Sequence, residues 1–200
     1  MNTFSRRPRR TRAFLALAAA ALIPALATLS APASAVNDTT FEETASAFWS
    51  APWVCDDGTI VDGTLLVETT RFFESPETED ANPTARIQFL ALCPEGSVNW
   101  GRGQAPATIT STPDLKGVTV SGSTLVRPVG DPLDHLVTFD VAWTGIGPVM
   151  VTVNGPGSKR QQREATATGQ VTFDGVDVVN GTANPPLGRP NPFIRVDTEK

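Results

Sequence analysis

The sequence predicts an all-β protein, with eight to nine short, mostly antiparallel strands forming a β-sandwich or a closed barrel that carries one disulfide. Three observations support this fold class. Apolar and polar residues alternate with period two in several segments, and Asp-Gly and Asn-Gly pairs recur between these segments. In addition, 17 prolines among the 200 residues oppose long helices, and no segment shows sustained apolar residues at helical spacing.

The alternation is clearest in "LVTFDVAW", from Leu136 to Trp143, where every second residue is apolar and Trp143 falls on the apolar face. This pattern is typical of a strand that is buried on one side. It recurs in "RIQFLALC" and in "VMVTV". We therefore expect Trp143, together with Val149, Val151 and Val153, to be committed to packing in the core.

The turn pairs separate the alternating segments into individual strands. Two-residue turns of Asp or Asn with Gly favour tight hairpins because these residues tolerate positive φ. The expected strands are 42–54, 59–73, 84–92, 106–111, 117–126, 134–144, 148–154, 161–173 and 176–183.

The chain divides into three parts. Residues 1–35 predict a secretory signal peptide, because a basic start and a short apolar stretch end in the small-residue motif Ala33-Ser34-Ala35. Both the general secretory and the twin-arginine route stay open. Residues 36–183 predict a single β domain. Residues 184–200 form a proline-rich tail that we expect to run extended along an edge of the sheet.

The charge of the chain beyond the signal peptide limits its partners. Five of the 16 basic residues and none of the 21 acidic ones lie in residues 1–35, so the remainder carries a net charge of −10. This acidity argues against nucleic acids and anionic membranes as partners. We expect a secreted, extracellular protein that is free of the membrane after cleavage, and the composition suggests a bacterial source.

The two cysteines predict a disulfide between Cys55 and Cys93, since exported proteins with an even number of thiols usually oxidise them. A zinc site would need further ligands, and His135 is the one histidine in the chain. Asp56 and Asp57 would raise the pKa of a neighbouring thiol and so disfavour a catalytic cysteine. We expect no metal and no cofactor.

Other groups that could carry chemistry have simpler structural roles. Asp134 precedes His135 directly, and neighbours in a strand point to opposite faces, which disfavours a catalytic dyad. Two strand acids could support glycoside hydrolysis if their carboxylates lay close together. Two acidic clusters could hold calcium, although neither of them follows the spaced pattern of a calcium-binding loop. The strand acids are Glu43, Glu68, Asp140 and Glu164, and the acidic clusters are Asp56, Asp57 and Asp62 and Glu74, Glu77, Glu79 and Asp80.

Two groups of residues are the candidate ligand-binding sites. Trp100 and Arg102 lie in the glycine-rich segment "VNWGRGQ", which we expect to be a loop. Lys159, Arg160 and Arg163 form a basic group at an expected hairpin tip on an acidic protein.

These observations predict a secreted, non-enzymatic binding or interaction domain for a small apolar ligand, a glycan or a protein partner. No nucleotide-binding, metalloprotease or serine-hydrolase motif occurs in the chain. The alternative is a carboxylate-dependent extracellular polysaccharide hydrolase. No catalytic residue is assigned on the sequence alone.

Overall fold

The structure is a computed structural model that describes residues 39–55, 57–74, 82–94, 98–129 and 132–200. It is almost entirely β, with one short 3-10 turn, η1 (Pro113–Leu115). The strands are β1 (Thr40–Val54), β2 (Ile60–Glu74), β3 (Thr84–Leu92), β4 (Val98–Pro106), β5 (Thr108–Thr112), β6 (Gly117–Pro128), β7 (His135–Gly155), β8 (Ser158–Phe173), β9 (Val176–Thr182) and β10 (Phe193–Glu199).

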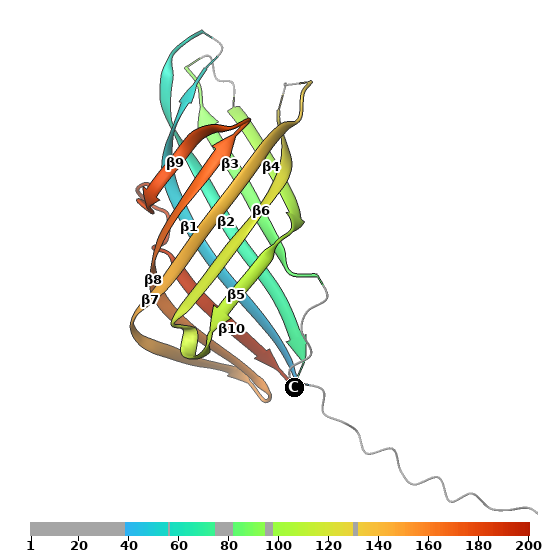
Figure 1. The fold of residues 1–200 in the computed structure, drawn as a ribbon. Helices are drawn as coiled ribbons and strands as arrows, with labels where there is room; N and C mark the ends of the chain where they lie inside the picture. Colours follow the sequence, from blue (N-terminus) through green and yellow to red (C-terminus); the bar gives the residue numbers. More distant parts are fainter. Residues whose placement is uncertain (1–38, 56, 75–81, 95–97, 130–131) are drawn as a thin grey trace, which may run out of the picture. The chain divides into compact units, whose positions relative to one another are not determined.

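The strands form one antiparallel sheet that closes into a ring. Neighbours follow the order β10-β1-β2-β3-β4-β6-β7-β8-β9, β5 pairs with β6, and an additional pairing joins β10 to β8. This last pairing connects the two sides of the sheet, and Figure 1 shows the resulting barrel of tilted strands. The all-β prediction is confirmed, and of its two architectures the closed barrel is the one observed. Closure leaves few unpaired strand edges.

The interior of the barrel is the hydrophobic core. Successive residues of a strand point to opposite faces, so every second residue faces inward. Inward residues from seven strands are fully buried, among them Trp49, Ile87, Val120, Trp143 and Ile194. The predicted burial of Trp143 is confirmed, with 1% of the residue exposed.

Three expectations about the strands are wrong. Residues 98–106 form β4, although most of this segment was expected to be a loop. Residues 135–155 form the single strand β7 in place of two strands, with a register shift between Ile146 and Met150. In the tail, Phe193–Glu199 do not run along an edge, because β10 pairs with β1 on one side and with β8 on the other.

The expected packing of Val149, Val151 and Val153 is also corrected. Val149 is half-buried, whereas Val151 is 54% and Val153 is 73% exposed. The pairing of β7 with β6 ends at Thr144, and Figure 1 shows the β7–β8 hairpin continuing below the ends of β5 and β6, so this part of β7 has less core to pack against. We call residues 147–163, the extended part of this hairpin, the β7–β8 arm.

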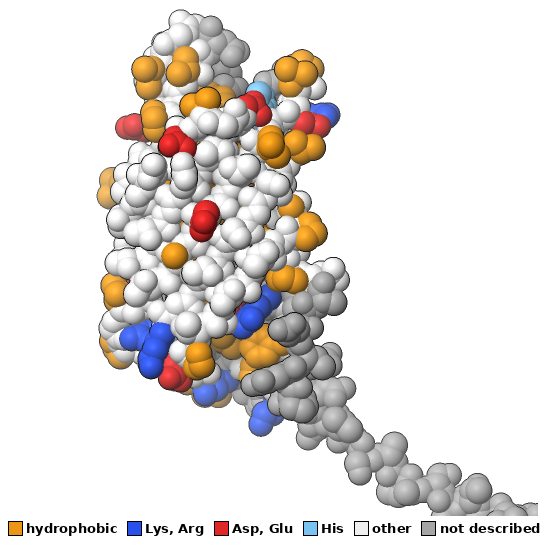
Figure 2. Space-filling model, in the orientation of Figure 1, with side chains coloured by type: hydrophobic (Ala, Val, Ile, Leu, Met, Phe, Trp, Pro, Cys, Tyr) orange, Lys and Arg blue, Asp and Glu red, His pale blue; other side chains and the backbone are white. Residues whose placement is uncertain are grey.

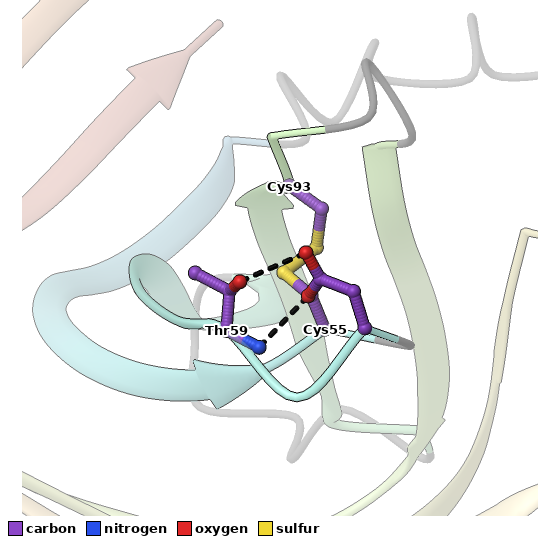
Figure 3. Close-up of a disulfide and its surroundings, with 4 residues drawn as sticks. Cys55, Thr59 and Cys93 are labelled. Carbon is purple, nitrogen blue, oxygen red and sulfur yellow. Dashed lines mark hydrogen bonds between the residues drawn. A yellow bond between two sulfur atoms is a disulfide. The ribbon is translucent and has the colours of Figure 1, made fainter.

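The predicted disulfide is confirmed, since Cys55 and Cys93 are bonded with their Cα atoms 5.8 Å apart. Figure 3 shows the bond beside the turn that joins β1 to β2. In this turn the backbone N–H and the hydroxyl of Thr59 both donate to the Asp57 carboxylate, at 2.8 Å each. The backbone hydrogen bond is the main reason that the pKa of Asp57 is lowered. Asp57 therefore acts as a turn residue.

Among the described residues, no helix has the length and apolar character needed to cross a membrane. The expected signal peptide, residues 1–35, lies outside the described part of the chain.

Candidate functional site

A pocket opens at the end of the barrel where β1 begins and β2 ends. We call it the open-end pocket, and its volume is about 570 Å³. Its wall combines apolar and polar side chains from β1, β2, β5, β7, β8, β10 and the η1 turn. The lining residues are Phe41, Glu43, Arg71, Phe73, Ser111, Thr112, Pro113, Asp114, Leu115, Val149, Val151, Gln161 and Val196. A pocket of this size is sufficient for a small organic molecule.

The first two strands place the main polar and aromatic groups of this pocket. Phe41 lies opposite Phe73 in the β1–β2 ladder, and Glu43 lies opposite Arg71. On β1, Glu43 shares its face with the buried Ala45, because the two positions differ by two residues. The register therefore directs an acid and a base into the end of a lumen whose buried residues are mostly apolar.

Glu43 and Arg71 form a partly buried ion pair. Arg71 Nη2 lies 2.9 Å from Glu43 Oε2, and the side chains are 8% and 29% exposed for Glu43 and Arg71, respectively. Arg71 Nη2 also donates to the hydroxyl of Ser111. The second carboxylate oxygen, Glu43 Oε1, is buried and accepts no hydrogen bond from the described part of the chain. Arg71 Nε is likewise buried without a hydrogen-bond partner among these residues.

An aromatic pair forms part of the wall of the same pocket. The rings of Phe41 and Phe73 are stacked, with centroids 4.9 Å apart and planes 4° from parallel. The guanidinium carbon of Arg71 lies 5.3 Å from the centroid of the Phe73 ring. This cation–π contact and the ion pair both restrain Arg71. The stacked aromatic pair therefore adjoins the partly buried ion pair.

Another part of the pocket wall comes from the β7–β8 arm and the η1 turn. The arm contributes Val149, Val151 and Gln161 to the lining. The turn approaches β7 so closely that a Cβ atom at Gly145 would lie 2.2 Å from the Leu115 carbonyl oxygen. Leu115 itself has a positive φ of 54°, which is strained for a residue with a branched side chain. The glycine at position 145 allows this turn to cover the pocket.

The first candidate pair from the sequence lies away from this pocket. Trp100 and Arg102 belong to β4, so their expected position in a loop is wrong. Arg102 is exposed and pairs in the ladder with Gln88 and Arg127. The side chain of Trp100 lies outside the described part of the structure. Arg102 does not line the open-end pocket.

The basic group on β8 is divided among different partners. Arg160 Nε lies 2.7 Å from Asp197 Oδ1, and this hydrogen bond is the largest contribution to the raised pKa of Arg160. Arg163 Nη1 donates to the Asp114 carbonyl oxygen at 3.3 Å, which ties β8 to the η1 turn. Lys159 is exposed. In Figure 2 most Lys and Arg side chains of the visible face gather at the lower end, where the arm lies in Figure 1.

The histidine lies at the other end of β7 from the arm. His135 Nδ1 lies 2.7 Å from Asp174 Oδ2, and this bond is the main cause of the lowered pKa of Asp174. Asp134 forms two hydrogen bonds with Arg127, at 2.7 and 2.8 Å, which lower the pKa of Asp134. As expected from strand geometry, Asp134 and His135 have separate partners.

The strand acids do not converge. Glu43 lines the open-end pocket, whereas Asp140 lines a separate shallow groove on the sheet, beside Ser121 and Gln170. Glu68 lies 3.8 Å from Arg86 in another pair, and Glu164 is exposed.

No group of three or more His, Cys, Asp or Glu residues in the described part of the chain could hold a metal ion. Asp56 and residues 75–81, which include most of the acidic segment weighed for calcium, lie outside that part.

Comparison with known proteins leaves the family open. No family model matches the chain, and no curated protein matches it. One similar solved structure is a Nitrosomonas europaea protein with a provisional AttH designation, at 14% sequence identity and a TM-score of 0.36. The match covers 82% of this chain and 52% of the other, so the chain spans about half the length of that protein. A similarity this low carries no functional argument.

Proposed function

We propose that this protein is a non-enzymatic binding protein that holds a small, largely apolar molecule in the open-end pocket. The observation that carries the proposal is a pocket of about 570 Å³ in which apolar side chains of β1, β2 and the β7–β8 arm adjoin the partly buried Glu43–Arg71 ion pair. A cavity that combines apolar surface with a few polar groups is the usual form of a small-molecule site.

Energetics supports the same conclusion. A buried ion pair contributes little net stability, because removing two charges from water offsets most of their attraction. Apolar residues of similar size in place of Glu43 and Arg71 would often be as stable or more so. A buried ion pair in place of apolar packing is expected where a protein binds a ligand or catalyses a reaction. The lining favours a small molecule over the glycan or protein partner, because Phe41, Phe73, Val149 and Val151 present apolar surface to it.

Occlusion of the pocket tests the proposal. Val151 lines the open-end pocket, whereas Val153 lies two residues further along the same strand, is 73% exposed and does not line it. Val151→Trp and Val153→Trp therefore add the same bulk inside and outside the pocket. Titration with the fluorescent aromatic amine 1-aminoanthracene should show saturable binding to the wild type and to Val153→Trp. We expect Val151→Trp to weaken this binding by at least about tenfold, equivalent to the loss of a few buried methylene contacts.

The two tryptophan variants also provide the contradicting outcome. If 1-aminoanthracene does not bind the wild type, or binds both variants equally, the open-end pocket is not a ligand site and the proposal is wrong. Circular dichroism of each variant checks that the barrel is retained.

We further propose that the protein is exported and acts outside the cell. The features that support this are the basic, apolar and small-residue segments of residues 1–35 and the two oxidised cysteines. The mature chain should begin at Val36. Intact-mass analysis of protein recovered from the culture medium of a bacterial host should give the mass of residues 36–200. Recovery only in the membrane fraction with residues 1–35 attached would contradict the proposal.

A further inference from the structure

We infer that a second surface of this protein, on the outside of β1, β2 and β3 beside the disulfide, docks a protein segment that combines apolar side chains with a lysine or an arginine. We call this surface the β1–β3 outer face, and its members are Pro52, Val54, Ile60, Asp62, Leu90 and Leu92. None of them lines the open-end pocket. The inference is therefore independent of the proposed small-molecule function.

The register of the sheet makes the members of this face neighbours. The pairs across the β1–β2 ladder are Val54 with Ile60 and Pro52 with Asp62. The β2–β3 register, extended by two residues, brings Leu92 beside Asp62. Residues opposite each other on one face of an antiparallel sheet have Cβ atoms about 4.5–5.5 Å apart, so the surface is continuous.

This face is apolar, although it lies on the outside of the barrel. Outward side chains of half-buried antiparallel strands are normally polar. Here Ile60 is 70%, Leu92 is 65% and Val54 is 62% exposed. The outer faces of β6 and β8 follow the usual pattern, with the exposed residues Thr119, Ser121, Ser123, Thr166 and Thr168. Figures 1 and 2 show that side of the barrel, where few side chains between the two ends are hydrophobic. A continuous exposed apolar patch is typical of an interaction site.

The disulfide holds the two sides of this face together. Cys55 directly follows Val54 at the end of β1, and it is bonded to Cys93. Cys93 directly follows Leu92 at the end of β3. Figure 3 shows the bond beside the turn between β1 and β2. A surface that is fixed before binding loses little conformational entropy when a partner docks, which favours affinity.

Asp62 determines which occupant fits the face. It is exposed, and its carboxylate forms no ion pair with another described residue. Any occupant that covers the face removes this charge from water, which is unfavourable unless the occupant supplies a cation or hydrogen-bond donors. An ammonium or guanidinium group of a partner supplies both.

Two other occupants of an apolar surface do not meet this requirement. The acyl region of a lipid bilayer has no donor for Asp62, and anionic headgroups would repel it. A second copy of the face would bring another Asp62 and no cation, since Asp62 is the one ionisable member. A protein segment with Lys or Arg among apolar residues is therefore the occupant that the face favours.

Three short fluorescent peptides test the inference. The first is an amphipathic peptide of Leu, Ala and Lys, the second has Glu in place of each Lys, and the third has Ser in place of each Leu. Fluorescence anisotropy at physiological salt should show the first peptide binding at least about tenfold more tightly than either of the others. The inference is wrong if the first peptide does not bind, or if either of the others binds equally well.

Variants assign the binding to this face. Val54→Thr, Ile60→Thr and Leu92→Thr, combined in one protein, should weaken the first peptide at least about tenfold, because they remove apolar contact area. Asp62→Asn should weaken it about threefold to tenfold. The control Asp140→Asn removes the same charge from an exposed position on β7 and should keep the affinity within about twofold. Equal losses in Asp62→Asn and Asp140→Asn would mean that binding follows net charge alone, and would overturn the inference.

Two measurements detect the other occupants. Co-sedimentation with phosphatidylcholine vesicles that the triple threonine variant abolishes would assign the face to lipid. A dimer in sedimentation equilibrium that the same variant dissociates would assign it to a second copy. Either result would overturn the inference. Urea unfolding checks each variant, and we expect small changes because the substituted residues are exposed. The peptide ranking and Asp62→Asn decide the inference even if the triple variant does not fold.

Discussion

Trp143→Ala is expected to lower the free energy of unfolding by about 3–5 kcal/mol, the usual range for truncation of a buried aromatic side chain. Trp143 is 1% exposed and belongs to the single core of the barrel. It is paired in the ladder with Val118 on β6 and Ala167 on β8, which are themselves buried. The alanine at position 167 is too small to fill the space that the indole leaves. Most of the cavity should therefore persist and add to the lost transfer free energy.

Leu125→Ala provides the control for this measurement. Leu125 lies on β6 and is 59% exposed, so its truncation should change stability by less than about 0.5 kcal/mol. Urea unfolding followed by tryptophan fluorescence and circular dichroism would measure both variants. A loss for Trp143→Ala no larger than that for Leu125→Ala would mean that the assigned core is wrong.

The strands that the sequence predicted well are those whose inward residues are large and apolar. In β7, Val137, Phe139, Val141 and Trp143 alternate with exposed or half-buried residues, and all four are buried. Alternation identifies such a strand because one face packs in the core and the other meets water. The disulfide was equally predictable, since two cysteines in a chain that the sequence predicts to be exported leave one pairing.

Strand β4 was missed because glycines occupy its inward positions. Gly101 and Gly103 alternate where apolar residues would reveal a strand. The reason is steric: a Cβ atom at Gly103 would lie 2.7 Å from the Leu125 carbonyl oxygen, and one at Gly101 would lie 2.3 Å from a methyl carbon of Val126. At these positions β4 lies so close to β6 that only glycine, which has no Cβ atom, fits. Closely spaced glycines more often indicate a loop, which explains why this strand was predicted to be one.

The open-end pocket was missed for a different reason. Glu43 was considered among the strand acids, which usually face solvent, yet it shares the parity of Ala45, Ala47 and Trp49 on β1. That parity was the available signal. Arg71 likewise shares the parity of Leu65 and Val67 on β2. Their pairing across the ladder depends on the register of the β1–β2 hairpin. An acid and a base on the apolar faces of two consecutive strands would have indicated an internal polar site.

The exposed valines show what alternation cannot predict. Val151 and Val153 continue the pattern of a buried strand, but the strand passes a bulge near Gly147 and leaves the core. Period two identifies which residues share a face, and it does not identify whether anything covers that face. Val151, which the alternation wrongly predicted to lie in the core, instead forms part of the pocket wall on the β7–β8 arm.

Removal of the disulfide is expected to lower the free energy of unfolding by about 4 kcal/mol, since the bond closes a loop between positions 38 apart in sequence. The variant to use is Cys55→Ala with Cys93→Ala, because both residues are buried and alanine adds no polar group to the site. Urea unfolding of this variant and of the wild type in a reducing agent should show similar losses. A loss below about 1 kcal/mol in both cases would contradict the chain-entropy argument.

The same variant should leave ligand binding intact while the protein is folded. Cys55 follows the end of β1, whereas Glu43 lies near its start, so at ~3.3 Å per residue the two positions are on the order of 40 Å apart along the strand. The affinity for 1-aminoanthracene should therefore stay within about twofold of wild type well below the melting temperature, which itself should fall. Loss of binding in a variant that is still folded would mean that the disulfide end of the barrel, and not the open-end pocket, holds the probe.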